Sequence, residues 1–218
     1  TFYAAVTRWS THRAADPFAV KNFRQWLTNK YHNDAGLRSA WGANAPTIAG
    51  VKPVLRKDNP ANELAWVDFV DWYQQSMTDY AKFWMTETRR HFPKGNIYLC
   101  TGGDARPEHG SDFGEQCKVA AESKGGVRIT NEGSNYALNF TYTRWVASAG
   151  QQYGAYYSFE PAGGVDAKGV VARVYNAAAS GARGLHYYYP NLFDTPAARE
   201  NFIRTGAQFQ QRKPLVEI

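Results

Sequence analysis

The sequence predicts an α/β fold of the (β/α)8 TIM-barrel type, in which this chain supplies about four consecutive β/α units plus preceding helices. Residues 96–212 alternate strand-like and helix-like segments four times, at about 29 residues per unit against roughly 31 in a complete barrel. Such alternation favours a parallel sheet with right-handed crossovers. The alternative, an open doubly wound sheet, is disfavoured because neither GxGxxG nor GxxxxGK[ST] occurs in the chain.

The part of the chain before the strands consists of predicted helices and loops. Asp16-Pro17 has the form of a helix N-cap followed by proline at the first helical position. Helices are expected over residues 17–31, 36–41 and 64–91. We therefore divide the chain into a helical and loop segment, 1–95, and four β/α units, 96–218.

The repeating part contains four predicted strand–helix pairs. Strands are expected over residues 96–101, 127–132, 153–160 and 184–189. Helices are expected over residues 111–124, 136–149, 166–180 and 196–212.

Composition excludes several classes of protein. Hydrophobic residues make up 44% and aromatic residues 15%, which is enough to build a core and excludes intrinsic disorder. Mean hydropathy is −0.55, and no stretch approaches the roughly 18 apolar residues of a membrane span. The chain begins with Thr1 and carries no visible signal peptide. We therefore expect that the natural start is missing, and the sequence leaves the compartment open.

Charge and cysteine content give no sign of nucleic-acid or metal binding. The 25 Lys and Arg residues give a net charge of +6, but they are spread singly without a basic stripe. Cys100 and Cys117 lack the CxxC spacing of a metal site. We expect buried free thiols rather than a disulfide, and neither a metal nor a cofactor.

The active site of a parallel barrel lies at the carboxyl ends of its strands. The candidates at the predicted strand ends are Asp104 and Arg106, then Arg128, Asn131 and Glu132, then Tyr157 and Glu160, and finally His186, Tyr188 and Asn191. We interpret Arg128, Asn131, Tyr157, Tyr188, Asn191 and Asp104 as substrate-binding residues. Catalytic chemistry is assigned to the carboxylates, since glycoside hydrolysis uses a pair of them.

Glu160 is the stronger of two candidate carboxylates. It ends an apolar, aromatic strand, and Pro161 holds it out of the helical region. The structural alternative is that Glu160 caps the next helix or pairs with Arg128 or Arg173. Glu132 could be the second carboxylate, and its spacing of two residues from Thr130 turns it to the same face as Arg128. Arg128 could then pair with Glu132 or form a purely structural salt bridge.

The helical segment resembles a known family. Phe23-Arg24-Gln25-Trp26-Leu27, Lys30-Tyr31 and the later Leu37 to Gly42 stretch resemble the FR-x-WL-x-x-KY … L-x-x-AWG motif of glycoside hydrolase family 42, the β-galactosidase-like members of clan A. The segments around Asn131-Glu132, Phe159-Glu160-Pro161 and Tyr187 to Asn191 look like strands six, seven and eight of such a barrel.

The resemblance implies that Glu160 is the nucleophile, because that residue ends strand seven in clan A enzymes. The acid/base of such enzymes ends strand four, before the FR-x-WL helix. Residues 1–16 contain no Glu, so we expect the first half of the barrel to lie elsewhere. Asn131-Glu132 has the form of an acid/base motif but falls on strand six.

Three functions remain open at this point. The chain could be a retaining glycoside hydrolase or the portion of one that carries the nucleophile. It could instead be a non-catalytic carbohydrate-binding half-barrel, or an unrelated α/β enzyme on an open sheet. A half-barrel exposes two sheet edges, so we expect another polypeptide or a second copy to cover them, alongside a carbohydrate ligand.

Overall fold

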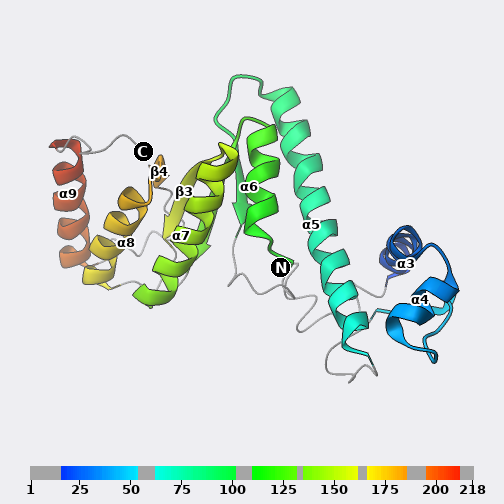
Figure 1. Ribbon diagram of the computed structural model, residues 1–218. Coiled ribbons are helices and arrows are strands. Elements are labelled where there is room, and N and C mark those ends of the chain that lie inside the picture. The colour runs from blue at the N-terminus through cyan, green and yellow to red at the C-terminus, as the bar shows by residue number, and fades with distance from the viewer. Residues whose placement is uncertain are drawn as a thin grey trace. The chain divides into compact units, whose positions relative to one another are not determined.

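The computed structural model describes residues 16–53, 62–101, 110–131, 135–161, 166–185 and 195–211. The chain divides into two compact units, residues 1–79 with 106–111 and residues 80–105 with 112–218. The boundary falls inside the long helix α5 (Glu63–His91), which contributes to both units (Figure 1). The division at residue 95 stays a prediction.

The first unit is helical. It contains α3 (Pro17–Tyr31), α4 (Asp34–Trp41), the 3-10 turn η1 (Ile48–Gly50) and the first part of α5. Asp16 accepts hydrogen bonds from the backbone N–H groups of Phe18 and Ala19, so the predicted N-cap is confirmed. Its core includes Phe23, Leu27, Leu37, Trp41, Phe69 and Trp72.

The second unit contains the sheet. Its elements are β1 (Tyr98–Thr101), α6 (Phe113–Glu122), β2 (Gly126–Asn131), α7 (Tyr136–Tyr153), β3 (Tyr156–Pro161), α8 (Ala167–Ala179), β4 (Gly184–Leu185) and α9 (Pro196–Gln211). The strands follow the order β1-β2-β3-β4, and every pair is parallel. This order and direction agree with the sequence prediction. β4 has two residues, and its predicted continuation lies outside the described residues.

Two glycines fix the strand boundaries. The predicted start of the third strand at residue 153 is wrong, because α7 continues to Tyr153 and ends at Gly154, whose φ of 82° is left-handed. At the start of β2, a Cβ on Gly126 would lie 2.1 Å from the ring of Tyr156. Glycine at 126 therefore lets β2 and β3 approach closely.

One face of the sheet carries the helices α6, α7 and α8 (Figure 1). Val127 and Ile129 of β2 and Tyr157 and Phe159 of β3 are buried in the core on this face. Because side chains alternate along a strand, Arg128 and Glu160 belong to the opposite face. α9 packs on α8, where the Tyr175 hydroxyl donates to Gln208 Oε1 at 2.7 Å. None of the described helices is long and apolar enough to span a membrane.

The two cysteines differ in environment. Both are free, as expected, but Cys100 is exposed on β1 and only Cys117 is buried, which corrects the expectation of two buried thiols. Burial, followed by the nearby Asp112 carboxylate, raises the pKa of the Cys117 thiol to about 12. The thiolate is the reactive form, so Cys117 is nearly inert at neutral pH.

This difference predicts the outcome of thiol labelling. At pH 8 the fraction of Cys117 present as thiolate is on the order of 10⁻⁴, and the side chain is out of reach of reagent. We expect Ellman's reagent to modify one thiol rapidly, with Cys100 identified by peptide mapping, and the second only in denaturant. Rapid release of two equivalents from the native protein would contradict the burial of Cys117.

Candidate active site

A buried ion pair joins the second and third strands. Arg128 Nη2 lies 2.8 Å from Glu160 Oε2. Glu160 is 4% exposed, and the Arg128 side chain is 23% exposed. The structure thus brings together two of the residues predicted from the sequence, and the guanidinium compensates the charge of a carboxylate that is otherwise costly to bury.

The strand register explains the geometry. Arg128 is the register partner of Ser158, whereas Thr130 is the partner of Glu160. The Cα of Arg128 therefore lies two residues closer to the amino ends of the strands than that of Glu160. The Arg128 side chain extends toward the carboxyl ends of the strands to contact Glu160. The Ser158 hydroxyl donates to the Gly184 carbonyl at 2.9 Å, which ties β3 to β4 beside this pair.

The structure also decides between structural alternatives for Glu160. The helix after β3 is capped by Asp166, whose carboxylate accepts from the Gly169 N–H at 2.6 Å. That hydrogen bond, together with one from Tyr136, lowers the pKa of Asp166. Buried Arg173 lies over the ring of Phe159, 5.6 Å from its centroid. Glu160 therefore does not cap α8, and within the described part of the chain its ion pair is with Arg128.

The other predicted site residues are not assembled around this pair. Tyr157 packs in the core beneath the helices, where burial raises its pKa. We therefore do not propose Tyr157 as a substrate-binding residue. Asn131 ends β2, but its side chain is outside the described part of the structure. The positions of Asp104, Arg106, Glu132, His186, Tyr188 and Asn191 all lie outside the described residues.

The second unit also has a cavity at the other end of the sheet. It has a volume of about 310 Å³ and is lined by Arg144, Tyr156 and Arg183, among others. Tyr156 begins β3 and Arg183 directly precedes β4, whereas Glu160 lies near the carboxyl end of β3. The described residues contain no group of three or more His, Cys, Asp and Glu side chains that could hold a metal.

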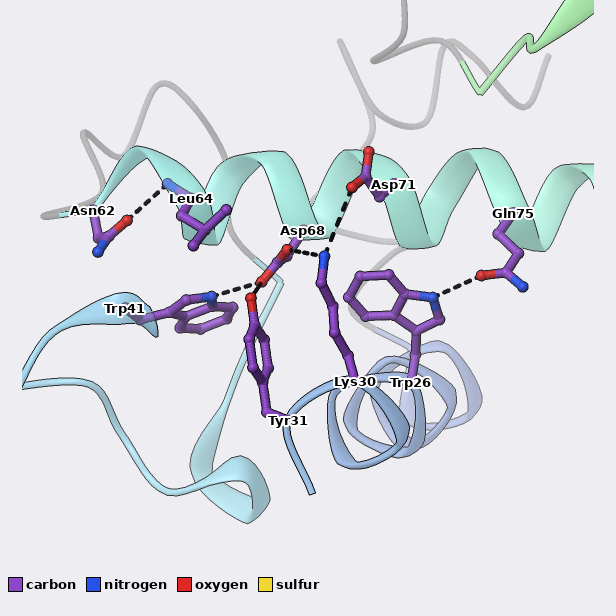
Figure 2. Close-up of polar contacts among 9 residues, drawn as sticks. All are labelled: Trp26, Lys30, Tyr31, Trp41, Asn62, Leu64, Asp68, Asp71 and Gln75. Atoms are coloured by element: carbon purple, nitrogen blue, oxygen red, sulfur yellow. Dashed lines mark hydrogen bonds and ion pairs between the residues drawn. The ribbon is translucent and has the colours of Figure 1, made fainter. Parts of the chain in front are cut away.

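A second buried carboxylate lies in the first unit, and sequence reasoning did not identify it. Figure 2 shows Asp68 of α5 accepting hydrogen bonds from Lys30 Nζ at 2.7 Å, the Tyr31 hydroxyl at 2.6 Å and Trp41 Nε1 at 2.7 Å. Asp68 is fully buried. Burial and the Asp68 carboxylate raise the pKa of Tyr31 above its usual value. Three donors occupy this carboxylate, so we assign it a structural role.

The Asp68 cluster gives the FR-x-WL-x-x-KY and AWG motif residues a physical explanation. Lys30 and Tyr31 end α3 and Trp41 ends α4, and all three donate to a single residue of α5. One aspartate thereby fixes three helices. A signal was present in the sequence, because Asp68 lies directly between the apolar residues Val67 and Phe69.

Comparison with known proteins places the fold. Neither a protein-family model nor a curated protein sequence matches the chain. Several solved structures are similar, three of which follow. The catalytic domain of β-amylase from Paenibacillus polymyxa gives a TM-score of 0.72 at 17% identity, over 92% of this chain and 56% of that one.

Two β-galactosidases are also similar. The polyextremophilic enzyme from the Antarctic haloarchaeon Halorubrum lacusprofundi gives a TM-score of 0.69 at 14% identity, over 91% of this chain and 36% of that one. The enzyme from the psychrophilic Marinomonas ef1 gives 0.67 at 12% identity, over 95% of this chain and 41% of that one. The chain thus spans 56% or less of each of these three structures. The chain therefore shares the fold of part of each of these three proteins.

Proposed function

We propose that this chain carries the nucleophile of a retaining glycoside hydrolase, similar to β-galactosidases, which acts on β-linked glycans or oligosaccharides. The observation that carries the proposal is the position of Glu160. It is a buried carboxylate near the carboxyl end of a parallel strand, ion-paired with Arg128, in a chain with a glycosidase-like fold. Active sites of such barrels lie at this end of the strands.

The proposed chemistry uses Glu160 in a double displacement. One Glu160 oxygen attacks the anomeric carbon and forms a glycosyl-enzyme ester, while a second carboxyl group protonates the departing oxygen. Water then attacks the same carbon and gives a proton to the second carboxylate, which now acts as a base, and the bond to Glu160 breaks and releases its carboxylate. Retention needs the two carboxyl groups about 5–5.5 Å apart. Glu132 is a candidate for the second group from its sequence position, and another polypeptide segment is the alternative source.

The proposal also includes the position of the strands in a barrel and the family of the chain. We assign β1 to β4 to strands five to eight of a (β/α)8 barrel of clan A, and the chain to glycoside hydrolase family 42. The parallel order of the strands supports the first assignment, and the FR-x-WL motif supports the second. Asp104, Asn131, Tyr188 and Asn191 remain candidates for sugar contacts.

A second function is favoured by one observation. The ion pair between Arg128 and Glu160 is also what a purely structural interior salt bridge would look like. A non-catalytic carbohydrate-binding half-barrel would keep this pair for folding and would bind sugar without cleaving it. The test is whether hydrolysis of an aryl β-galactoside depends on Glu160 when the protein stays folded.

A further inference from the structure

The cavity in the second unit lies where α7 and α8 end. The two helices lie side by side on the sheet (Figure 1). The second half of α7, the end of α8 and the residues that lead into β3 and β4 form the walls of the cavity, whose volume is about 310 Å³. Pockets for small molecules begin at about 300 Å³. The cavity is therefore large enough for a small ligand, and Glu160 and Arg128 are not among its lining residues.

Three polar residues of α7 line one part of this cavity. Arg144, Ser148 and Gln151 are spaced by four and then three residues, which places them on one side of the helix. All three are exposed. Arg144 Nη1 donates to the Ala179 carbonyl oxygen at the end of α8, at a long distance of 3.5 Å. The side chain of Arg144 thus extends toward α8, and most of its N–H groups remain available to a ligand.

A second arginine lines the cavity from the turn before β4. The backbone N–H of Arg183 donates to the Tyr157 carbonyl oxygen at 2.8 Å. The Arg183 guanidinium lies over the ring of Tyr156, 5.9 Å from its centroid, which is within the range of a cation–π contact. These contacts hold Arg183 beside the cavity, while its side chain stays exposed.

Arg144 and Arg183 give the cavity a positive charge. Neither guanidinium has a carboxylate partner within the described part of the chain, and no Asp or Glu is among the described residues that line the cavity. The caps of α7 and α8, Gly154 and Ser180, also line it. Each helix end there contributes about half a negative elementary charge, so the two ends offset about one of the two positive charges. The remaining positive charge favours an anionic ligand.

Ser180 adds a hydroxyl group to this cavity. Its oxygen is buried and has no hydrogen-bond partner among the residues that the structure describes. A buried polar group without a partner is unfavourable. A molecule held in the cavity would supply the missing partner once the side chain rotates about χ1.

We propose that this cavity binds a small organic anion that carries one phosphate or carboxylate group together with hydroxyl groups. The oxyanion would accept hydrogen bonds from Arg144 and Arg183, because the planar guanidinium matches the geometry of both phosphate and carboxylate. The hydroxyl groups of the ligand would bond to Ser148, Gln151 and Ser180. The proposal does not rest on the proposed glycosidase function, since it uses neither Glu160 nor its chemistry.

Three small probes test the class of ligand. Glycerol 3-phosphate, glycerate and glycerol share a three-carbon skeleton and differ in charge. They have no anomeric carbon, so they are not substrates of the proposed glycosidase. Each is titrated into the full chain at an ionic strength held constant with sodium chloride. The amide resonances of Gly154, Gly181 and Arg183 report on the cavity.

We expect at least one of the two anions to shift these resonances with a Kd below about 1 mM, and glycerol to give no saturable shift. The tighter anion identifies the group that the cavity prefers. Arg144→Gln and Arg183→Gln should each weaken binding by about 10-fold or more, because each removes a charge-assisted hydrogen bond. The matched control is Arg204→Gln, at an exposed arginine of α9 that does not line the cavity, and it should change the Kd by less than about two-fold.

Both arginines of the cavity are exposed, so the variants are expected to stay folded, and amide resonances outside the cavity should keep their positions. Arg183→Lys keeps the charge but loses the paired donors, and it should weaken binding by about three-fold or more. The proposal is overturned if neither anion gives saturable shifts at these amides below about 10 mM, or if glycerol binds as tightly as the anions. Unchanged binding in the Arg144 and Arg183 variants, or an equal loss in Arg204→Gln, would overturn it as well.

Discussion

Replacing Glu160 by glutamine is expected to lower the rate of hydrolysis of 2,4-dinitrophenyl β-galactoside by about 10³- to 10⁵-fold. Glutamine keeps the volume of the side chain but cannot attack the anomeric carbon. Dinitrophenolate departs without a proton, so this substrate reports on the nucleophile and not on the general acid. The effect is measured by comparing initial rates of hydrolysis between the parent and the variant. Both proteins are prepared in the form that cleaves this substrate.

The same substitution should cost little stability. The amide oxygen of the introduced glutamine can still accept from Arg128, whose side chain is 23% exposed to solvent that screens its charge. We expect a loss of about 1–2 kcal/mol in the free energy of unfolding. Glu122→Gln, at an exposed glutamate of α6, is the matched control and should leave the rate within about two-fold. If Glu160→Gln also stayed within a few-fold, Glu132 would become the next candidate.

Removal of the Asp68 carboxylate is expected to destabilise the first unit by about 3 kcal/mol, because Asp68→Ala leaves three donors without their acceptor. Of these, the indole N–H of Trp41 is in a buried environment, and breaking charge-assisted hydrogen bonds there carries the full desolvation cost. The Lys30 side chain is 38% exposed, so water can solvate its ammonium group after the carboxylate is removed. The total loss of stability is therefore smaller than the sum of three fully buried hydrogen bonds.

Asp71→Ala is the matched control for Asp68→Ala. Asp71 lies one turn further along α5, 3.9 Å from the same lysine ammonium, but its side chain is 49% exposed. We expect a loss of less than about 0.5 kcal/mol there. Urea unfolding followed by fluorescence of buried Trp41 and Trp72 measures both variants. Equal losses for the two aspartates would show that the buried hydrogen bonds of Asp68 add no specific stability.

The features predicted well from the sequence are local ones. The helix start at Asp16-Pro17 is encoded by adjacent residues, and the structure has the same cap. The alternation of strands and helices is a repeating local pattern, and it was enough to predict four parallel strands in chain order. The end of α7 was missed because Gly154 acts through a left-handed backbone conformation, which the apolar pattern around it does not reveal.

The features that sequence reasoning missed depend on contacts between distant segments. Asp68 meets partners from 27 to 38 residues away, and no local pattern links them. The direction of Tyr157 was a different kind of error. Tyr157 lies three residues before Glu160, so the alternation of a strand turns it with Phe159 toward the helices while Ser158 and Glu160 face the other side. In contrast, the pairing of Arg128 with Glu160 was one of the predicted alternatives, since parallel neighbouring strands bring their carboxyl ends together.

The measurement that tests the central claim most directly is covalent trapping of the nucleophile. 2,4-Dinitrophenyl 2-deoxy-2-fluoro-β-galactoside has a leaving group that needs no protonation, and its fluorine slows turnover of the glycosyl-enzyme, so the ester accumulates. We predict that mass spectrometry of the inactivated protein finds one fluorosugar per chain, on the peptide that contains Glu160, and none on the Glu160→Gln variant. A fluorosugar attached to Glu132 or to any other residue would contradict the assignment of Glu160 as the nucleophile.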